Sequence, residues 1–572
     1  MKSGVNWKIG GPAGAGIMSV GHMFARACLR HGWQVFCYTE YPSLIRGGHN
    51  VYQIHASPKE IKSQKSQVEV LVALDQQTII KNQAQLSQNG ILLYDPVATT
   101  LAAKKPDRQY LEVPWGKMSQ EICGSDLMKN TIALGASLAL YQGDAIVLKK
   151  LIQEEFADKN QKIINDNLKA VEKGYQFIKK NAKIQMTWPA LKKIRAKERI
   201  LVSGNEAAGL GALAAGCKFY VAYPMTPATS ILHFLAKYER DYDLLVKQAE
   251  DEIAVINMAI GAAFAGVRSM CATSGGGFAL MNESLGFAGI AEIPLVVILS
   301  QRTGPATGLP TWTGQSELLY AINASHGEFL RVVMAPGDAS ETFWSMVNAF
   351  NLADKYQIPV IVLLDKYLSE SPSSLETFDT KKVTIKRGEI LTQAKLNKIK
   401  DYKRYQFTKS GISPRSLPGL AGGEHQANSD EHDEYGYSTE DAAIRQKMMD
   451  KRAAKLSGLV KELPQPKIYG SKNAALTIIC WGSSKMPAVE ALNDLKDVRV
   501  MHLQYLCPFP AQFIKKNVNP EKSIIIEGNQ NGQLQQLIQQ HTGLNIKKTL
   551  LKYDGRPFYP EEIVNAVNQL KR

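Results

Sequence analysis

Short apolar runs rich in Val, Ile and Leu alternate with helix-like segments along three stretches of this chain, and this alternation is the strongest constraint on its fold. Examples are VEVLVALD over 68–75, PLVVIL over 294–299 and SIIIEG over 523–528. Alternating strands and helices are typical of parallel sheets covered by helices. We therefore predict an α/β fold. The length of 572 residues, at roughly 100–200 residues per domain, predicts several domains.

The alternation is interrupted twice, so we predict three α/β domains joined by irregular segments. The first domain should contain a parallel sheet and is followed by a basic linker. The second irregular segment is rich in Lys, Gly, Ser and acidic residues, with one helix expected over 440–463. The predicted boundaries are 1–185 for the first domain, 186–197 for the linker, 198–372 for the second domain, 373–465 for the extended segment and 466–572 for the third domain.

The seven cysteines are scattered, odd in number and form no CxxC pair. This pattern predicts reduced thiols in a cytoplasm, with no metal or iron–sulfur cluster held by this chain itself. No stretch approaches about 18 uninterrupted apolar residues, so we expect no membrane span. The N-terminus has no apolar signal core. These observations together predict a cytoplasmic protein.

The formal net charge is +15. A basic chain can bind nucleic acid, anionic lipid or an acidic protein. The lysines are spread out, as in LKKLIQEEFADKNQKIINDNLKAVEKGYQFIKK, which is typical of solvated helix faces. No nucleic-acid-binding motif accompanies the charge, so we expect no nucleic-acid partner.

Two glycine-rich turns occur in the first domain. Gly11, Gly14 and Gly16 follow a strand and open a helix, a geometry that presents backbone N–H groups to an anion. The spacing fits neither the dinucleotide fingerprint nor a P-loop. A tight turn that lets the helix approach the sheet is an equal alternative. Arg46, in the second turn, is either an anion contact or a surface cation.

Polar and glycine residues follow four strands of the second domain. Ligands of a parallel α/β sheet bind beyond the carboxyl ends of its strands. We therefore expect one Glu, one Arg and several hydroxyls to converge on one sheet edge. The four segments are Tyr223-Pro224-Met225-Thr226-Pro227, Glu250-Asp251-Glu252, Thr273-Ser274-Gly275-Gly276-Gly277 and Ser300-Gln301-Arg302-Thr303-Gly304-Pro305.

Each of these residues also has a plainer interpretation. An acid at a helix start commonly interacts with the helix dipole, which applies to Glu252. Thr226 could be a turn residue and Arg302 a salt-bridge partner. The three glycines could form only a tight turn. The pattern alone leaves both interpretations open.

Several motifs resemble one enzyme family. YPMTPAT, QAEDEIAVINMAIGAAFAG, TSGGGFALMNE, SQRTGPATGLPT and EGNQNGQL are similar to the α chain of 2-oxoacid:ferredoxin oxidoreductases. GGPAGAG…EYPSLIRGGHN is similar to the γ domain of that family, fused here in front of α. The resemblance covers nearly the whole chain. It implies a γ-like first domain, a thiamine-diphosphate-binding (pyrimidine-type) second domain and a transketolase C-terminal-like third domain that serves packing and interface.

The resemblance also implies site residues and a thiamine diphosphate cofactor. Glu252 would hydrogen-bond the aminopyrimidine ring of the cofactor, with Glu250 as the runner-up. Thr226 and Arg302 would contact the 2-oxoacid, and the planar guanidinium of Arg302 suits a carboxylate. The glycine loop with Arg46 would be a coenzyme A or anion site, although GGPAGAG departs from the usual GxGGQG. The remaining implied cofactor-binding residues are Tyr223, Pro224, Thr273, Ser274 and Gly275.

A partner is implied by what the chain lacks. The GDG motif that holds Mg²⁺ and diphosphate in this cofactor class is absent, and no cysteine set supports a cluster. The resemblance therefore implies a β subunit that carries Mg²⁺ and a [4Fe–4S] cluster, in an (αβ)₂ assembly.

The implied reaction is CoA-dependent oxidative decarboxylation of a 2-oxoacid to an acyl-CoA with reduction of ferredoxin, or its reverse. We favour 2-oxoglutarate, because fused γ–α chains of this layout are often of that type. A pyruvate or branched-chain or aryl 2-oxoacid enzyme is the first alternative. A non-catalytic scaffold subunit is the alternative from another class.

Overall fold

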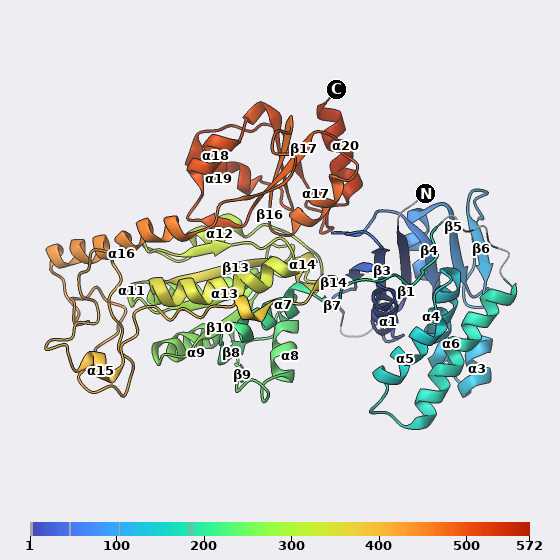
Figure 1. The fold of residues 1–572 in the computed structure, drawn as a ribbon, viewed down its shortest axis with the longest axis horizontal. Coiled ribbons are helices and arrows are strands. Elements are labelled where there is room, and N and C mark those ends of the chain that lie inside the picture. Colours follow the sequence, from blue (N-terminus) through green and yellow to red (C-terminus); the bar gives the residue numbers. More distant parts are fainter. Residues whose placement is uncertain are drawn as a thin grey trace. The chain divides into compact units, whose positions relative to one another are not determined.

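The computed structural model describes residues 4–44, 47–101, 103–181, 184, 186 and 188–571. The chain forms two compact units. The first comprises Met1–Val202, Glu370–Thr377 and Tyr559–Arg572, and the second comprises Ser203–Ser369 and Phe378–Phe558. Figure 1 shows the elements of both units, coloured along the sequence. Each unit is an α/β structure, as the alternating pattern predicts.

The first unit is built on an eight-stranded sheet in the order β6-β5-β4-β1-β3-β2-β14-β7. The strands from β6 to β1 are parallel, whereas β3, β2, β14 and β7 pair antiparallel with their neighbours. The strands are β1 (Val5–Pro12), β2 (Gln34–Glu40), β3 (His49–Ser57), β4 (Val68–Ala73), β5 (Leu86–Tyr94), β6 (Gln109–Glu112), β7 (Arg199–Val202) and β14 (Ser373–Glu376). The helices are α1 (Ile17–Arg30), α2 (Gln76–Asn82), α3 (Trp115–Cys123), α4 (Lys129–Leu140), α5 (Ala145–Glu155), α6 (Gln161–Asn181) and α20 (Pro560–Leu570).

The parallel sheet predicted for the first domain is present only from β6 to β1, and the rest of the sheet is antiparallel. Strand β3 follows β2 after a short connection and pairs antiparallel with both β2 and β1. Short connections join antiparallel neighbours, whereas parallel strands need a longer crossover. The connection contains Gly47 and Gly48 at φ +75° and +95°, a backbone region that glycine adopts without strain. The glycine turn therefore forms part of a hairpin.

The packing of α4 against α6 depends on two glycines. A Cβ atom at Gly135 would lie 2.1 Å from the carbonyl oxygen of Val171, and one at Gly174 would lie 2.0 Å from that of Ile132. Nothing larger than hydrogen fits at either position, so the two helix backbones touch there. This contact closes the core of the first unit, which is centred on the buried Trp7.

The second unit contains a seven-stranded sheet in the order β18-β12-β13-β11-β10-β8-β9. All neighbouring strands are parallel except β18, which is antiparallel to β12. The strands are β8 (Phe219–Ala222), β9 (Leu245–Gln248), β10 (Ser269–Thr273), β11 (Leu295–Gln301), β12 (Val332–Met334), β13 (Pro359–Asp365) and β18 (Tyr505–Cys507). The helices are α7 (Gly204–Ala214), α8 (Thr229–Lys237), α9 (Glu252–Phe264), α10 (Gly275–Leu280), α11 (Asn282–Ile290), α12 (Leu318–Asn323), α13 (Ala339–Tyr356) and α14 (Lys366–Glu370).

A five-stranded sheet in the order β15-β17-β16-β19-β20 completes the second unit. Its apolar side chains and those of the seven-stranded sheet form one continuous core, in which Leu299 and Ile479 are both fully buried. The strands are β15 (Lys467–Gly470), β16 (Leu476–Trp481), β17 (Val498–Leu503), β19 (Ser523–Glu527) and β20 (Thr549–Leu551). The helices are α17 (Lys485–Ala491), α18 (Ala511–Asn517) and α19 (Gln533–Thr542).

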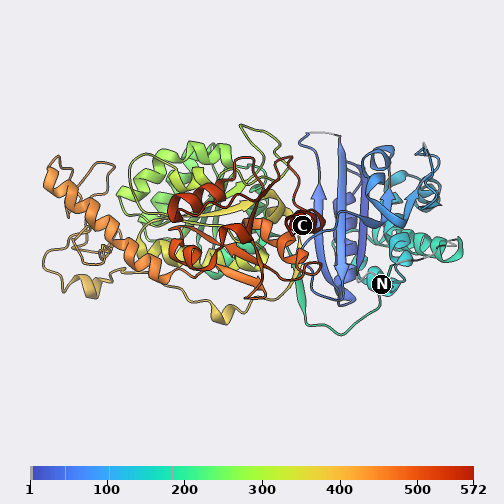
Figure 2. The same cartoon turned by 90° about the horizontal axis from the view of Figure 1, so that it is seen from above.

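The irregular segment between β14 and β15 contains α15 (Gln393–Leu396) and α16 (Ala442–Glu462). The helix expected over 440–463 is thus confirmed, and Figure 2 shows it (orange) with the loops of the segment beside it. Two lysines of α16 bind the fully buried Glu292: Lys451 Nζ and Lys455 Nζ each lie 2.5 Å from a carboxylate oxygen. The segment is therefore fastened to the second unit.

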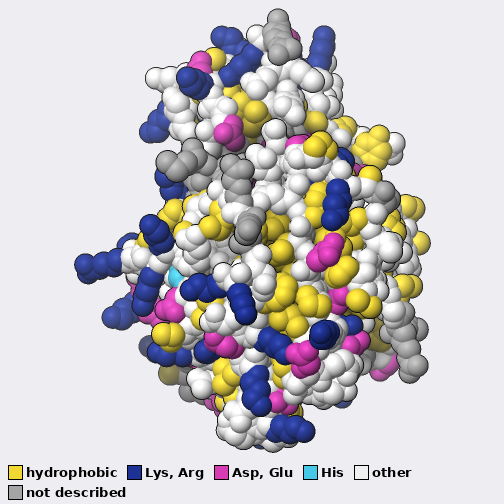
Figure 3. Space-filling view, turned by 90° about the vertical axis from the view of Figure 1, so that its right-hand side faces the viewer, with side chains coloured by type: hydrophobic (Ala, Val, Ile, Leu, Met, Phe, Trp, Pro, Cys, Tyr) yellow, Lys and Arg dark blue, Asp and Glu magenta, His cyan; other side chains and the backbone are white. Residues whose placement is uncertain are grey.

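Several charged side chains are buried together with partners of opposite charge. Arg268 and Arg415 are buried and both pair with Asp354, with the Arg268 Nε to Oδ2 distance 2.8 Å. Lys451 and Lys455 are buried against Glu292. On the face seen in Figure 3, Lys and Arg side chains are dispersed and acidic side chains stand among them. A net charge of +15 therefore does not translate into a uniformly basic surface.

Candidate active site

Four neighbouring strands of the second unit bring the polar strand-end segments to one sheet edge. The order β11-β10-β8-β9 places the loop after each strand beside the next. All four strands are parallel, so their carboxyl ends share that edge. The four strand-end segments therefore lie together at this edge of the sheet. They begin at Arg302, Ser274, Tyr223 and Ala249. This is the edge at which parallel α/β sheets bind ligands.

Glu252 is the first residue of α9 and is buried, with 3% of its surface exposed. The helix is capped by its neighbour Asp251, whose Oδ1 accepts a hydrogen bond from the Ala254 amide at 2.8 Å. Glu252 Oε1 is buried and has no hydrogen-bond partner among the described residues. A buried oxygen without a partner costs about 1–3 kcal/mol. Glu250, by contrast, is exposed.

The triple glycine lets α10 begin directly against Glu252. A Cβ atom at Gly277 would lie 2.1 Å from Thr273 Oγ1 and 2.6 Å from Glu252 Oε1. Thr273 and Ser274 are fully buried, and Ser274 Oγ has no hydrogen-bond partner among the described residues. Gly276 instead faces open space. Two unpartnered oxygens, of Glu252 and Ser274, therefore lie close to the same short segment.

Arg302 and Thr226 meet across the edge. Arg302 Nη1 donates a hydrogen bond to the Thr226 carbonyl oxygen at 2.7 Å, and this bond fixes the guanidinium at the end of β11. Burial lowers the pKa of Arg302, while the nearby Glu317 carboxyl acts in the opposite direction. A guanidinium so placed can bind an anion with its remaining N–H groups.

A cleft of about 680 Å³ opens beside these residues. Two predicted segments line it, through Ser274, Gly275 and Arg302. Thr226 does not line the cleft but accepts a hydrogen bond from Arg302, which does. Glu252 and Thr273 also do not line it, and both lie next to Gly277. Tyr223 and Pro224 are exposed and are not among the lining residues. The structure thus brings Ser274, Gly275 and Arg302 to the cavity, and the other five residues predicted for this site are not among its lining residues.

The third predicted domain also forms a wall of this cleft. Asn529, Gln530 and Asn531, from the EGNQNGQL motif, line it. Asn529 Nδ2 donates to the Gln315 carbonyl oxygen at 2.9 Å, and Gln533 Nε2 donates to the Ser316 carbonyl oxygen at 2.6 Å. The resemblance implies packing and interface for this domain, not chemistry. The EGNQNGQL motif is the sequence feature that could have indicated that the third domain contributes to the cleft.

Glu317 is a cleft residue that the sequence reasoning missed. It directly precedes α12 and lies beside the glycines, because a Cβ atom at Gly275 would lie 3.0 Å from Glu317 Oε1. Its Oε2 is buried without a hydrogen-bond partner among the described residues. Burial raises the pKa of Glu317 to about 7. In sequence it is one acid before a short helix, with no spacing that sets it apart.

In the first unit, the two glycine-rich turns lie together. The Ala13 amide donates to the Gly48 carbonyl oxygen at 2.9 Å. Gly16, at φ +69°, precedes α1, and no side chain of the described residues caps that helix. Gly11 and Gly14 flank the same bend, and a Cβ atom at Gly14 would meet no neighbour within 4 Å. Arg46 lies outside the described residues.

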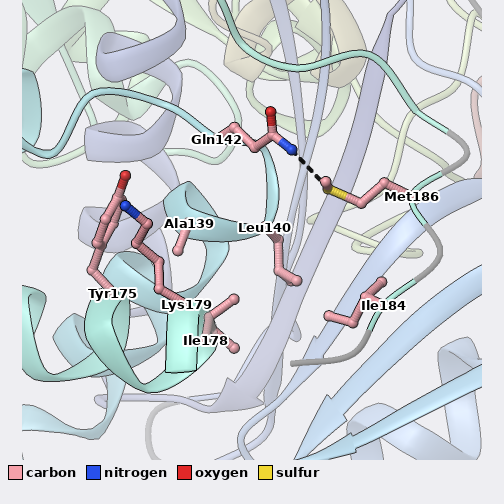
Figure 4. A pocket seen from close by; sticks show the side chains of 8 residues that line it. All are labelled: Ala139, Leu140, Gln142, Tyr175, Ile178, Lys179, Ile184 and Met186. Carbon is pink, nitrogen blue, oxygen red and sulfur yellow. Dashed lines mark hydrogen bonds between the residues drawn. The ribbon is translucent and has the colours of Figure 1, made fainter. Parts of the chain in front are cut away.

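The first unit contains a separate cavity of about 460 Å³. Figure 4 shows that its lining comes from α4 and the turn after it, from α6 and from the segment that follows α6. Gln142 Nε2 approaches Met186 Sδ at 3.7 Å across it. None of the predicted site residues lines this cavity.

Neither metal clusters nor membrane helices are found in the part of the chain that the structure describes. There, no three His, Cys, Asp or Glu side chains are arranged to hold a metal ion. None of its helices is long and apolar enough to cross a membrane.

Comparison with known proteins finds similarity over almost the whole chain. The family model described as pyruvate flavodoxin/ferredoxin oxidoreductase, thiamine diphosphate-binding, matches residues 210–451, and the model described as pyruvate ferredoxin/flavodoxin oxidoreductase matches 6–177. The α subunit of 2-oxoacid:ferredoxin oxidoreductase 2 of Aeropyrum pernix is 32% identical, with 98% of this chain and 97% of the relative covered. The subunit KorA of 2-oxoglutarate synthase from Methanothermobacter thermautotrophicus is 29% identical, with 66% of this chain and 100% of the relative covered.

A solved structure is similar over both full lengths. It is the 2-oxoglutarate:ferredoxin oxidoreductase of Magnetococcus marinus with 2-oxoglutarate, coenzyme A and succinyl-CoA bound. The TM-score is 0.93 and the sequence identity 31%, with 100% of each chain covered. The similarity therefore includes the cleft, the irregular segment and the first unit.

Proposed function

This chain belongs to the α-subunit family of 2-oxoacid:ferredoxin oxidoreductases, and on that premise we propose that it is the fused γ–α subunit of a 2-oxoglutarate:ferredoxin oxidoreductase. The enzyme would convert 2-oxoglutarate, coenzyme A and oxidised ferredoxin to succinyl-CoA, CO₂ and reduced ferredoxin, or run in reverse. The choice of 2-oxoglutarate is supported by the acid named for the similar solved structure and for the KorA relative.

One observation carries the proposal: Glu252 is buried at the ligand-binding edge of the sheet with an unpartnered carboxylate oxygen. An acid that served only the helix dipole would gain nothing from being buried in this way. A ring nitrogen of a ligand would supply the missing hydrogen bond. The donor set therefore fits the aminopyrimidine of thiamine diphosphate.

The residues of this chain have separate tasks in the proposed site. Glu252 would hold the cofactor ring through a proton at Oε1, with Thr273, Ser274 and Gly275 against the cofactor. The outer residues Tyr223 and Pro224 would cover it. Once bound, thiamine diphosphate supplies the nucleophilic carbon that attacks the 2-oxo group and permits loss of CO₂.

Substrate binding would fall to Arg302 and Thr226. The guanidinium of Arg302 is held by the Thr226 carbonyl oxygen, with its other donors available to the cleft. A planar donor pair matches the two oxygens of a 2-oxoacid carboxylate. Thr226, in contact with Arg302, would face the same end of the substrate.

The remaining parts of the enzyme would come from elsewhere. We assign Mg²⁺, the diphosphate contacts and a [4Fe–4S] cluster to a β subunit, in an (αβ)₂ complex that reduces ferredoxin in the cytoplasm. The glycine loop of Gly11, Gly14 and Gly16, with Arg46, is proposed as an anion site for coenzyme A. Its support is the uncapped start of α1, where backbone N–H groups are available to an anion.

The first test is Glu252→Gln in the complex with the β subunit. Gln cannot exchange the proton, so we expect kcat with methyl viologen, coenzyme A and 2-oxoglutarate to fall by roughly 100- to 10,000-fold. Glu250→Gln, two residues earlier and exposed, is the matched control and should keep its activity. Assembly is checked by size-exclusion chromatography.

Three outcomes separate the alternatives. Full activity of the Glu252→Gln complex would contradict the assigned role. Wild-type activity with pyruvate or a branched-chain or aryl 2-oxoacid, but not with 2-oxoglutarate, would keep the chemistry and replace the substrate. No activity with any acid, in a complex that holds thiamine diphosphate and cluster, would favour the scaffold alternative.

A further inference from the structure

We propose that Glu317 is a substrate-binding residue that acts in its protonated form, so that binding of the 2-oxoacid takes up a proton from solvent. The inference rests on the proposed function, because it takes the cleft beside Arg302 as the 2-oxoacid site. It adds a second carboxyl to that site, with a task different from that of Glu252. Four observations lead to it, beginning with the position of the side chain.

Glu317 faces the same cavity as Arg302. Both line the cleft of about 680 Å³, together with Ser274 and Gly275. The Glu317 backbone is anchored, since its amide donates to Gln301 Oε1 at 3.1 Å. Gly275 leaves room for the carboxyl, because a Cβ atom there would lie 3.0 Å from Oε1. The carboxyl is therefore held at the cavity wall by the fold.

The Glu317 carboxyl has an unused oxygen. Oε2 is buried and has no hydrogen-bond partner among the described residues. Arg302 does not form an ion pair with it in this structure, because its Nη1 is directed to the Thr226 carbonyl oxygen. A buried carboxylate without a salt bridge is costly, and a proton removes most of that cost. The geometry thus favours the neutral acid.

The surrounding charges leave this preference in place. Hydrogen bonds from the Ser316 and Glu317 backbone amides and the charge of Arg302, at the end of β11, favour the ionised form, whereas Asp365, at the end of β13, repels it. From α12 and the third domain, Tyr320 and Tyr553 also line the cleft. Burial is the largest influence, and the pKa of Glu317 is raised to about 7. Glu252 faces the other side of α10, behind Gly277.

An arriving 2-oxoacid adds a negative charge to this cavity. Arg302 and Glu317 are the lining residues with charged side chains. A carboxylate bound at Arg302 lies near Glu317, and like charges raise the pKa of a carboxyl further. The protonated acid then donates its O–H to an oxygen of the substrate. The ionised acid would repel the same oxygen.

The sign of the pH dependence follows. Below a pH of about 6 Glu317 already carries its proton, so KM for the 2-oxoacid should not change with pH. Above about 7.5 the free enzyme must first take up a proton, so KM should rise by up to about tenfold for each pH unit. The chemical steps after binding start from the protonated complex, so kcat should change less than KM.

The test compares wild type, Glu317→Gln and Glu317→Ala in the complete complex with the β subunit. KM and kcat for 2-oxoglutarate are measured with methyl viologen and saturating coenzyme A from about pH 6 to 9. Gln keeps a donor and cannot ionise, so its KM should stay near the low-pH wild-type value throughout. Ala should also give a flat profile, but with KM raised several-fold because the donor is lost.

The results separate this inference from the proposed function. A wild-type KM that is independent of pH, or a Glu317→Gln profile as steep as the wild type, would overturn the role of Glu317 while leaving the enzyme activity standing. Absence of turnover with every 2-oxoacid tested would contradict both the role of Glu317 and the proposed function. A flat KM profile in Glu317→Gln beside a rising one in wild type is the supporting outcome.

Discussion

At the scale of single residues, Gly277 controls the position of the Glu252 carboxyl. We predict that Gly277→Ala displaces it, because the added methyl would lie 2.6 Å from Glu252 Oε1 and 2.1 Å from Thr273 Oγ1. Overpacking of this kind costs about 1–3 kcal/mol. Calorimetric titration of the complex should find thiamine diphosphate affinity reduced roughly tenfold or more.

The neighbouring glycine offers a matched control. Gly276→Ala adds the same methyl group in the same helix, but nothing lies within 4 Å of it. Because Gly276 lines the cleft, the comparison is made on the complex without ligand, in which the free energy of unfolding of Gly276→Ala should equal that of the wild type and exceed that of Gly277→Ala. Equal free energies of unfolding in Gly276→Ala and Gly277→Ala would show that Glu252 tolerates a shift and would weaken its assignment.

The sequence could predict which residues belong to the candidate site only where those residues directly follow a strand. The strand-end pattern predicted that Glu252, Thr226 and Arg302 share one edge, because parallel strands align their ends. It could not distinguish Glu252 from Glu250, since only burial separates them. Glu317 escaped prediction for a related reason: its environment comes from Gly275 and Asp365, which lie far away in sequence.

At the scale of elements, α16 is held by a buried charge cluster. We predict that Glu292→Gln lowers the free energy of unfolding of the second unit by roughly 3–5 kcal/mol at neutral pH, because Lys451 and Lys455 lose their buried partner. The exposed pair of Glu462, also on α16, with Lys355 is the control, and Glu462→Gln should cost about 1 kcal/mol or less. Chemical denaturation of each variant provides the measurement.

The same cluster predicts a pH dependence. Burial opposes ionisation of Glu292, but the charges of Lys451, Lys455 and Arg404 outweigh it and hold the pKa of Glu292 well below its usual range. Its contribution to stability is therefore present above the unfolded pKa, near about 4.3, and is lost as pH falls through lower values. The stability difference between wild type and Glu292→Gln should shrink as the solution is acidified. A difference that stayed constant down to about pH 3 would contradict this account.

Elements were predictable where local pattern and fold agree. The helix over 440–463 and five strands of the seven-stranded sheet follow from the sequence pattern, whereas the short strands β12 and β18 do not. The hairpin of β2 and β3 did not, because strand direction is set by the connection and not by the apolar run itself. The ion pairs that attach the irregular segment to the second unit could not be predicted from local sequence either, because Glu292 and Lys451 are 159 positions apart.

At the scale of the whole molecule, the cations behind the net charge of +15 are dispersed among acidic side chains on the face that Figure 3 shows. Buried cations such as Arg268 and Lys455 pair with buried acids and are inaccessible to a polyanion. We predict that fluorescence anisotropy with a DNA duplex detects only weak binding, with Kd above about 1 μM at physiological salt. Tight binding under those conditions would contradict this prediction and would indicate a continuous basic face on the protein.

The ribosome synthesises the residues of one wall of the cleft long before those of the opposite wall. Glu252 and Tyr553 are separated by about three hundred positions, and a ribosome adding about 5–20 residues per second needs roughly 15–60 s to cover that distance. During this interval a nascent chain would carry the glycines and Glu252 without the Asn529 loop opposite them. The complete cleft therefore exists only after synthesis has passed Tyr553.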